Sequence, residues 1–536
     1  MAERTAQRAA PDASRPLSRA RVKRISRKID AVLARDINVQ RAHIGVRIER
    51  LSDGALLYAH DDQQLYVPAS NTKILTTTAA FALLGPDWKT RTTVESATAP
   101  DASGTISGDL VLVGRGDPNL SGRVLPYNGK TSRTTPPLAP LQALADQIVE
   151  RGVKHIRGSV VGDDSWFAYE RWGDSWGWDD LMWEYGAPVS ALTINDNQMF
   201  LDIMPGAKVG DIAPFTIDPM SPLYKIEDRV VTGPAGSVRR IGIDREPGSY
   251  SIAMWGTIPL NGPADDEGLS IEDPALFAAD AFATMLKARG VQIDGAPGTQ
   301  HADPSTLPFP PLSLPPSQVT SAVPAVATPL QQVAPVEPAR VVLAELDSHP
   351  LAEDIKVTNK VSQNLHVEIL MRQLGRAKSL LPNTPAGGSV WGGTSVVHQF
   401  LKSIGVTDDE VQYLDGSGMT PHNLVTPAAF CKVLRYARTQ PWGAQFVDSL
   451  PLAGVDGTLD NRFVHTPTAG RVRAKTGSLT EVYTLSGYAT PLAASKRDSS
   501  SSDELVFSVM INDSKMGGKA SRAVIDDIVR AIVETK

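Results

Sequence analysis

The pattern of apolar and polar positions predicts a mixed chain of helices and strands whose two ends contribute to one sheet. From Ile44, the residues I-G-V-R-I-E-R-L alternate, reach an S-D-G turn and continue as A-L-L-Y-A-H, which predicts a β-hairpin. Strand patterns return near the end of the chain in V-R-A-K-T-G-S, Y-T-L-S-G-Y-A and L-V-F-S-V-M-I-N. Helical patterns cover residues 351–374, 391–405, 427–440 and 519–533. Strands at both ends with helices between them suggest one sheet built from both ends of the chain.

Two segments of the middle region share a pattern. A helix that begins near Leu138 ends in E-R-G-V-K-H-I-R-G, with Gly152 placed to terminate it. A second helix begins D-P-A-L-F and ends A-R-G-V-Q-I-D-G, with Asp273 as its N-cap and Gly290 as its terminator. Because a helix leads into a strand in both segments, we expect two related halves of one α/β subdomain. Between them, residues 205–261 alternate in short runs, which predicts a small β insert.

The chain is too long for a single hydrophobic core, since it has 536 residues. A proline-rich, almost uncharged stretch follows the middle region and predicts a solvated linker, with partial covering of a cleft as the alternative. We therefore divide the chain into five parts: a basic, partly disordered leader (1–40), a domain built from both chain ends (41–95 and 345–536), an inserted α/β domain (96–205 and 262–302), a small nested β domain (206–261) and the proline-rich linker (303–344).

Composition and charge exclude several classes of function. The hydrophobic fraction of 42% and the charged fraction of 21% are those of an ordinary globular protein. A net charge of -6 gives no reason to expect nucleic acid as a partner. With one cysteine, Cys431, the chain can form neither an intramolecular disulfide nor a cysteine-based metal site. It contains no apolar run long enough for an integral membrane segment.

The N-terminal residues are polar and then basic. The first residues, M-A-E-R-T-A-Q-R-A-A-P-D, lack the apolar segment of a signal peptide. Residues 15–35 are rich in Arg and Lys. A solvated helix face behind a disordered leader explains this charge, and docking to a membrane surface is the alternative.

The stretch P-A-S-N-T-K-I-L-T-T-T-A-A-F (68–81) places a serine and a lysine one turn apart at the start of an apolar helix. Residues i and i+3 lie on the same face of a helix, so we expect the hydroxyl of Ser70 near the ammonium of Lys73. A serine hydroxyl needs a base beside it to become a nucleophile, and a lysine whose pKa is lowered by burial or by another cation can be that base. The alternative is a helix N-cap beside a solvated lysine.

Two further motifs make this pattern specific. V-S-Q-N-L-H contains Ser362 and Asn364 in an S-x-N arrangement, and R-A-K-T-G-S contains a K-T-G triplet that begins at Lys475. S-x-x-K and S-x-N are each expected by chance about once or twice in such a chain, whereas K-T-G is expected about 0.1 times. Each occurs once, in the order S-x-x-K, S-x-N, K-T-G. The combination is therefore far more specific than any one motif.

The three motifs occur together in penicillin-binding proteins and class A β-lactamases. The long stretch between Ser70 and Ser362 has no counterpart in class A β-lactamases. The blocks G-D-L-V-L-V-G-R-G-D-P-N-L, W-D-D-L-M-W-E-Y-G-A-P-V-S-A-L-T-I-N-D-N, Y-L-D-G-S-G-M-T and G-V-D-G-T-L resemble those of the low-molecular-mass class C penicillin-binding proteins. This resemblance runs from about Ile44 to the C-terminus, outside the proline-rich segment. It implies an α/β (α+β) fold, the penicillin-binding-protein/β-lactamase-like transpeptidase fold, with a large inserted region forming one or two extra domains.

The resemblance implies catalytic roles for three residues. Ser70 is the nucleophile that becomes acylated, Lys73 is its general base, and Ser362 passes the proton to the leaving group. It also implies that the domain built from both chain ends is the catalytic one.

Five residues are implied to bind the substrate. Asn364 holds the amide carbonyl of the substrate, and Lys475 keeps the hydroxyl network electropositive. Thr476 and Ser478 bind the terminal carboxylate, and the strand that contains Gly477 pairs with the extended peptide. The backbone N–H groups of Ser70 and Ser478 form the oxyanion hole.

The implied function is that of a serine-type D-alanyl-D-alanine carboxypeptidase, with D,D-endopeptidase activity as a second activity. Its substrates are peptidoglycan stem peptides, its inhibitors are β-lactam antibiotics, and it needs no cofactor or metal. The implied location is extracytoplasmic, in the periplasm or the cell-wall space, although no signal peptide is visible. Pro421 stands where the family usually has an arginine of the substrate side-chain pocket.

Two other functions remain open. A β-lactamase-like hydrolase would need a second base for deacylation, and we identify none in the sequence. A non-catalytic peptidoglycan-binding protein would not need the nucleophile, so the intact motifs argue against it.

A competing nucleophile motif is present in G-D-S-W-G (173–177), which has the G-x-S-x-G pattern of α/β-hydrolases. Tryptophans and acids surround it, and no apolar strand directly precedes it. We interpret it as part of an aromatic surface that packs against the catalytic domain.

Several other residues have structural interpretations. His366 is expected to be a hydrogen-bonded core or rim group, with a place in the cleft as the alternative. Asp415 and Asp456 are expected to cap backbone groups in Gly-rich turns. Cys431 is expected to be a small buried hydrophobe. Whether Asp196 approaches a ligand is left open.

Overall fold

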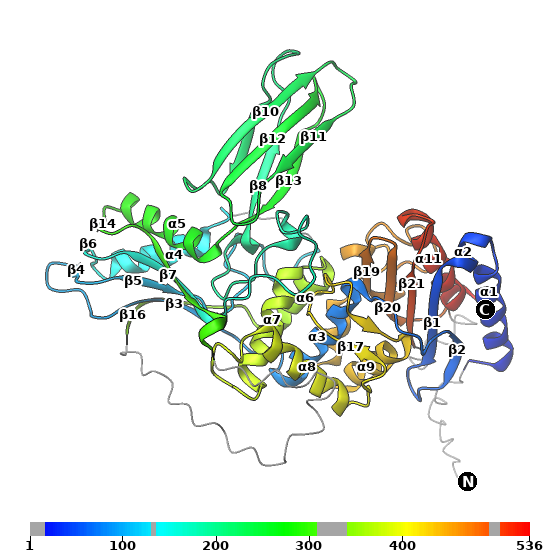
Figure 1. The fold of residues 1–536 in the computed structure, drawn as a ribbon. Coiled ribbons are helices and arrows are strands. Elements are labelled where there is room, and N and C mark those ends of the chain that lie inside the picture. Colours follow the sequence, from blue (N-terminus) through cyan, green and yellow to red (C-terminus); the bar gives the residue numbers. More distant parts are fainter. Residues whose placement is uncertain (1–16, 130–135, 308–339, 493–503, 536) are drawn as a thin grey trace, which may run out of the picture. The chain divides into compact units, whose positions relative to one another are not determined.

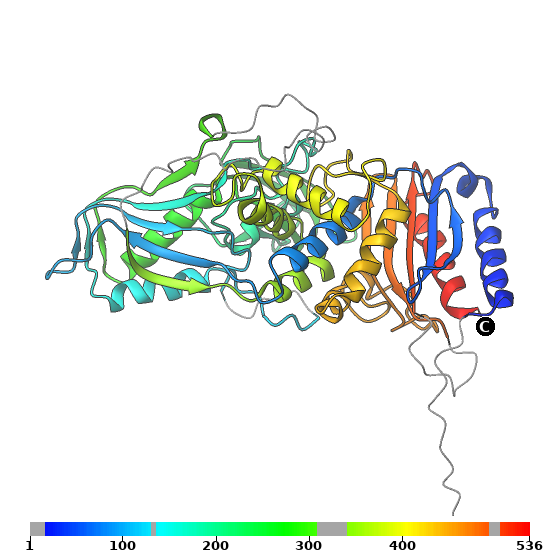
Figure 2. The ribbon, with the colours of Figure 1, turned by 90° about the horizontal axis from the view of Figure 1, so that it is seen from below.

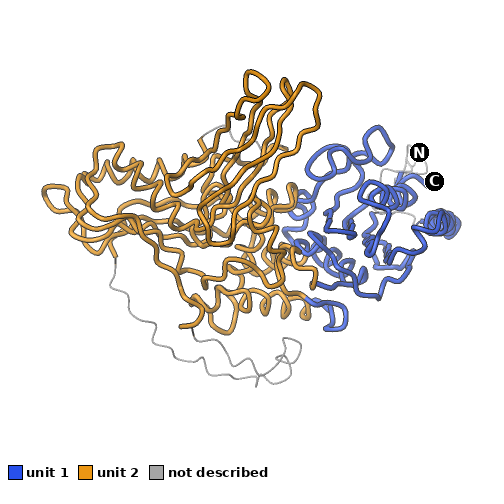
Figure 3. Tube along the Cα trace, turned by 45° about the horizontal axis from the view of Figure 1, so that its top comes forward, with its two compact units in different colours: residues 1–74, 404–412, 423–536 blue, residues 75–403, 413–422 orange. Residues whose placement is uncertain are grey.

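The computed structural model describes residues 17–129, 136–307, 340–492 and 504–535 (Figure 1). The chain divides into two units (Figure 3). Unit 1 consists of residues 1–74, 404–412 and 423–536, and unit 2 consists of residues 75–403 and 413–422. The five-part division and its boundaries stay a prediction. Within the described ranges, no helix has the length and apolar character needed to cross a membrane.

Both ends of the chain enter one antiparallel sheet in unit 1, which confirms the prediction. The predicted hairpin forms β1 and β2, and β1 pairs along its whole length with β21, from His43 opposite Asn512 to Arg50 opposite Leu505. The strand order is β19-β20-β21-β1-β2. The strands are β1 (His43–Arg50), β2 (Leu56–His60), β19 (Val472–Leu479), β20 (Val482–Ala489) and β21 (Leu505–Asn512).

Helices cover both faces of this sheet. Helices α1 (Arg19–Leu33) and α11 (Gly518–Glu534) pack together on one face, and α9 (Pro427–Thr439) packs on the other (Figures 1 and 2). Ile25 and Ile29 of α1 are buried, whereas its Lys and Arg residues at positions 23, 24, 27 and 28 are exposed. The exposed basic residues agree with the solvated helix face that the sequence predicts. Residues 1–16 of the leader lie outside the described residues.

The shorter elements of unit 1 include α2 (Ile37–Arg41), α10 (Gly443–Ser449) and the two-stranded pair β17 (Val411–Gln412) and β18 (Leu424–Val425).

Unit 2 contains the two related halves that the sequence predicts. In each half a long helix leads into a short strand, α4 (Ala139–Glu150) into β6 (His155–Ile156) and α5 (Pro274–Ala288) into β14 (Gln292–Ile293). The two short strands pair in parallel, and so do the strands that follow them, β7 (Val160–Ala168) and β15 (Gly298–Ala302). The third strand of the small sheet is β4 (Thr105–Ile106). Each half therefore contributes one strand to each of two sheets.

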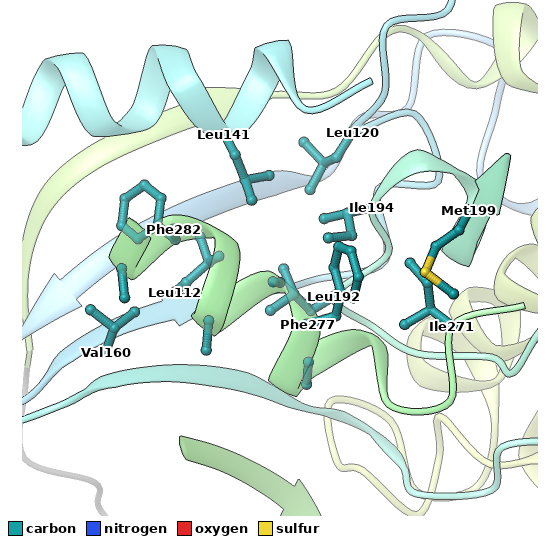
Figure 4. Packing of buried hydrophobic residues seen from close by; sticks show 14 of the residues in the cluster. Leu112, Leu120, Leu141, Val160, Leu192, Ile194, Met199, Ile271, Phe277 and Phe282 are labelled. Carbon is teal, nitrogen blue, oxygen red and sulfur yellow. The ribbon is translucent and has the colours of Figure 1, made fainter. Parts of the chain in front are cut away.

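The helix ends in these halves are the predicted ones. Asp273 accepts a hydrogen bond from the N–H of Leu276 at the start of α5. Gly152 and Gly290, just past the two helices, have φ angles of +81° and +86°, a conformation that favours glycine. Side chains from both helices pack around Leu112, among them Leu141 of α4 and Phe282 of α5 (Figure 4).

The larger sheet of unit 2 has the order β15-β7-β5-β3-β16. Its strands are β3 (Arg91–Ser96), β5 (Leu110–Val113), β7 (Val160–Ala168), β15 (Gly298–Ala302) and β16 (Val341–Asp347). Most of the predicted proline-rich linker, residues 308–339, lies outside the described residues.

Strands fill the predicted β insert. Three of them form a sheet in the order β10-β12-β11, namely β10 (Lys225–Gly233), β12 (Ser251–Pro259) and β11 (Arg240–Asp244). A fourth, β9 (Phe215–Asp218), joins β8 (Gln198–Ile203) and β13 (Asp265–Ser270) in a second sheet.

The predicted single helix over residues 351–374 is wrong at its centre. The structure has α6 (Leu351–Lys360) and α7 (Asn364–Lys378), with a turn between them in which Ser362 has a φ angle of +64°. The local sequence carries no Gly or Pro to signal this break. The next helix is α8 (Val390–Ser403), close to its predicted bounds.

Candidate active site

Ser70 lies in a tight turn that opens an apolar helix. The turn is η1 (Ala69–Asn71), and α3 (Thr72–Leu83) continues from it. Ala69 has a φ angle of +48°, which is costly for a residue with a Cβ and is often found at functional sites. Lys73 is fully buried, and its Nζ lies 2.9 Å from Oγ of Ser70. The predicted serine–lysine contact is therefore present.

The sheet of unit 1 holds this turn in place. Oγ1 of Thr484, on β20, donates to the carbonyl of Pro68 over 2.9 Å. Nδ2 of Asn71 donates to Oγ of Ser486 over 2.8 Å. Because both partners belong to a central strand, the position of Ser70 is fixed by the sheet and not by the helix alone.

The strand β19 passes against the same turn. A Cβ added to Gly477 would lie 2.6 Å from the carbonyl oxygen of Pro68 and 2.3 Å from Oγ1 of Thr484. Only a glycine allows this approach. On this strand Lys475 is buried, Thr476 is half-buried and Ser478 is exposed. The edge of the sheet beside Ser70 therefore has a polar surface.

Lys475 is fully buried, and its pKa lies well below the ordinary value. Burial is the larger cause of this lowering, and the positive charge of Lys73 adds to it. Nζ of Lys475 donates to the carbonyl of Thr476 over 2.9 Å. The positive charge of Lys73 therefore disfavours the charged form of Lys475, and the two amines are electrostatically coupled.

The S-x-N residues lie at the turn between α6 and α7 in unit 2. Ser362 is half-buried, and Asn364 is buried as the first residue of α7. Nδ2 of Asn364 donates to the carbonyl of Tyr185 over 2.8 Å. The predicted site residues are therefore divided: Ser362 and Asn364 belong to unit 2, and Ser70, Lys73, Lys475, Thr476, Gly477 and Ser478 belong to unit 1.

The competing G-x-S-x-G motif does not form a nucleophile elbow. Strand β7 ends at Ala168, well before Ser175, and no helix begins directly after the motif. The indole N–H of Trp176 donates to Oδ2 of Asp415 over 3.0 Å, and both groups are buried. The motif thus packs through its tryptophan, as the aromatic surrounding suggested.

The turns around Asp415 and Asp456 are capped as predicted. Asp415 accepts hydrogen bonds from the N–H groups of Gly418 and Thr420, each over 2.8 Å. Burial raises the pKa of Asp415, and the nearby charge of Glu368 raises it further. Asp456 accepts from the N–H of Leu452 over 2.8 Å.

Two other residues confirm their structural interpretations. Cys431 is fully buried, and burial raises the pKa of its thiol well above the usual value. His366 is fully buried and lies between two carboxylates, those of Asp354 and Asp196. Asp196 is therefore occupied within the core of unit 2. In the described part of the chain, no group of three or more His, Cys, Asp or Glu side chains is arranged to hold a metal ion.

Sequence analysis did not single out two residues beside the motifs. Asn71 anchors the Ser70 turn, as described above. Oγ1 of Thr458 lies 2.7 Å from Oγ1 of Thr476 and orients the hydroxyl of the K-T-G strand. Thr458 lies in the quoted block G-V-D-G-T-L, which was the available signal, although its contact depends on the fold.

Comparison with known proteins identifies the family. The model of the D-Ala-D-Ala carboxypeptidase 3 (S13) family matches residues 25–308 and 326–534. The chain belongs to this family. It is 31% identical to the D-alanyl-D-alanine carboxypeptidase of Actinomadura sp. (strain R39) over 529 residues, which cover 96% of this chain and 86% of the relative. It is 26% identical to penicillin-sensitive carboxypeptidase A of Dictyostelium discoideum over 88% of this chain and 83% of the relative.

The fold is that of a solved penicillin-binding protein. Penicillin-binding protein 4 (DacB) from Haemophilus influenzae matches with a TM-score of 0.73 and 22% identity, over 94% of this chain and 97% of that chain. The predicted fold class, family and enzyme class are confirmed. This protein is a serine peptidase that acts as a D-alanyl-D-alanine carboxypeptidase.

Proposed function

We propose that this carboxypeptidase works through an acyl-enzyme on Ser70. The observation that carries the proposal is the buried Lys73 amine, 2.9 Å from Oγ of Ser70. Lys475 lies in the same buried region, and the charge of Lys73 contributes to its lowered pKa, so the two amines are electrostatically coupled. Neither feature would be needed by a protein that only binds peptidoglycan.

In the proposed reaction, the neutral amine of Lys73 accepts the hydroxyl proton of Ser70. Oγ bonds to the carbonyl carbon of the penultimate D-alanine, and the N–H groups of Ser70 and Ser478 stabilise the oxyanion. The peptide C–N bond breaks as Ser362 gives its hydroxyl proton to the leaving D-alanine nitrogen and takes the proton held by Lys73, which becomes neutral again. Water then attacks the ester carbonyl and gives a proton to the Lys73 amine. Lys73 returns this proton to Oγ of Ser70 as the C–Oγ bond breaks, which frees Ser70 and releases the shortened peptide.

Substrate binding is assigned to the K-T-G strand and to Asn364. Thr476 and Ser478 hydrogen-bond to the terminal carboxylate, and the positive charge shared between Lys73 and Lys475 attracts it. The absence of a side chain at Gly477 lets the strand approach the reacting serine. Asn364 binds the amide carbonyl of the stem peptide.

We infer the substrate and setting from the relatives. The natural substrates are peptidoglycan stem peptides that end in D-Ala-D-Ala, with D,D-endopeptidase cleavage as a second activity, and the location is extracytoplasmic. A relative is named penicillin-sensitive, and the H. influenzae protein has been solved with a β-lactam. We therefore expect β-lactams to acylate Ser70.

The test is intact mass spectrometry after incubation with benzylpenicillin, together with release of D-alanine from a peptide that ends in D-Ala-D-Ala. The wild type should gain the mass of one penicillin molecule and release D-alanine. Ser70→Ala should do neither. Ser175→Ala is the matched control, because it removes an exposed serine hydroxyl from the competing motif and should leave both signals intact.

Other outcomes would contradict the proposal in different ways. Rapid loss of the drug without an adduct would indicate a β-lactamase. An adduct that persists in Ser70→Ala would show that another residue is the nucleophile. If neither adduct nor D-alanine appears and sacculus binding survives Ser70→Ala, the protein binds peptidoglycan without catalysis.

A further inference from the structure

A buried histidine supports the turn that carries Ser362 and Asn364. His366 lies in the first turns of α7 and has no exposed surface. Its Nδ1 lies 2.7 Å from Oδ1 of Asp354 on α6, and its Nε2 lies 3.2 Å from Oδ1 of Asp196. The ring therefore bridges the two helices on either side of the turn to a third segment.

The geometry determines the charge of this ring. Carboxylates only accept hydrogen bonds, so an imidazole between two of them satisfies both when both nitrogens carry a proton. Burial favours the neutral ring, but the two carboxylates outweigh it and raise the pKa of His366 to about 9. Arg123 forms an ion pair with Asp196, which leaves two cations and two anions in the cluster.

Two other polar residues, Asn119 and Asp117, lie near this cluster. Nδ2 of Asn119 donates to Oδ1 of Asp354 over 3.1 Å. Asp117 is also buried, and burial raises its pKa to about 6. The negative charge of Asp354 adds to this increase.

The same cluster contacts the S-x-N turn directly. Gln363, the middle residue of the motif, accepts from the N–H of Leu365 with its Oε1 and so caps α7, while its Nε2 lies 3.4 Å from Oδ2 of Asp196. Asp196 belongs to η3 (Asn195–Asn197), in which all three residues have φ angles between +48° and +55°. Such a turn is costly unless its surroundings hold it.

We propose that His366, as an imidazolium clamped between Asp354 and Asp196, is a positioning residue that sets the orientation of Ser362 and Asn364 for acylation. It touches neither substrate nor reacting atoms and acts through the turn between α6 and α7. The proposal rests on the roles proposed above for Ser362 and Asn364.

The test measures the rate of acylation by a fluorescent penicillin per active site, with sites counted by mass spectrometry. His366→Gln can donate from one position only, and it should slow acylation about 10- to 100-fold, because an error of 1 Å in a positioning group costs about 100-fold. His366→Leu should slow it further. His155→Gln is the control, because it removes a histidine–carboxylate pair at the surface of the same unit, that with Asp294, and should leave the rate unchanged.

A double-mutant cycle separates positioning from general destabilisation. If His366 acts through Asn364, adding His366→Gln to Asn364→Ala should cost less than it costs in the wild type. Full additivity, or a lower count of reactive sites with an unchanged rate per site, would overturn the inference and indicate a merely structural role. Asp354→Asn gives the same comparison if His366→Gln does not fold.

The experiment distinguishes an error in the roles proposed for Ser362 and Asn364 from an error in the role proposed for His366. If Ser362→Ala and Asn364→Ala acylate at the wild-type rate, the proposed function of the motif is wrong. If they are slow while His366→Gln is normal, only the clamp is wrong.

Discussion

At the scale of single residues, the burial of Lys475 lowers its pKa and reduces the free energy of unfolding at neutral pH. A buried amine loses the hydration of its charged form, so the folded protein favours the neutral lysine, whereas the unfolded chain binds a proton up to an ordinary pKa. Between these two pKa values the unfolded state holds more protons. The contribution of Lys475 to the free energy of unfolding therefore rises with pH, by up to about 1.4 kcal/mol per pH unit.

Lys475→Met should remove this dependence. We expect the variant to lose most acylation activity but to gain stability relative to the wild type at neutral pH. The gain should shrink as the pH rises toward 10, and denaturant unfolding at several pH values measures it. Lys519→Met, at an exposed lysine of the same unit, should show no such trend. A difference in stability that does not change with pH would contradict the assignment.

At the scale of elements, the site depends on how closely a strand approaches a turn. Gly477 is the residue of β19 at which this approach is tightest, because the nearest neighbours of an added Cβ include the carbonyl of Pro68, which cannot rotate away. The K-T-G triplet indicated a strand lysine and a turn but not the reason for the glycine. That reason appears only when β19 and η1, far apart in the sequence, pack together.

Gly477→Ala should displace the strand or the Ser70 turn. We expect a loss of about 1–3 kcal/mol in the free energy of unfolding from overpacking. Acylation should fall by about 100-fold, since a shift of 1 Å has that effect on a reacting group. Gly298→Ala, in a strand of unit 2 with no atom near the added Cβ, is the control. Equal activity of the two variants would show that the approach is not tight.

The helices also show which element predictions depend on local sequence. Asp273 and Gly290 mark the two ends of α5 correctly, because capping is a contact within the helix and its neighbours. The break at Ser362 was missed, because no Gly or Pro in the local sequence signals it. In the fold, Asp196 contacts both Gln363 and His366 beside this turn.

At the scale of the whole molecule, the two ends of the chain complete one layer of unit 1. Nε of Arg21, on α1, donates to the carbonyl of Thr535 over 2.8 Å. Ile29 of the same helix is fully buried in the core beneath the sheet. The basic segment near the N-terminus is thus part of the packed unit, with Arg21 buried and the Lys and Arg residues at positions 23, 24, 27 and 28 exposed.

Ile29→Ala should therefore destabilise unit 1. We expect a loss of about 2–5 kcal/mol in the free energy of unfolding, as for other buried aliphatic truncations. Lys28→Ala, next to it on the exposed face, should change stability by no more than about 0.5 kcal/mol. Thermal or denaturant unfolding monitored by circular dichroism distinguishes them. Equal effects would mean that α1 is not packed in solution.

The sequence by itself determined where most elements form and that Ser70 and Lys73 lie side by side. The S-x-x-K spacing placed Lys73 one turn from Ser70, because helical periodicity is a local property. The strand patterns at both ends of the chain predicted the sheet of unit 1, because short runs of β-branched and apolar residues between turn residues are a local signal. The motif order and the resemblance of four sequence blocks then identified the family.

Only the tertiary structure decided the electrostatics and the fine geometry of the site. The lowered pKa of Lys475 requires burial among residues distant in the chain, and so does the charge of His366 between Asp354 and Asp196. The close approach at Gly477 and the left-handed turn at Ser362 also depend on such contacts. Local spacing cannot encode them, because the energy of a buried charge or a strained turn is set by what packs against it.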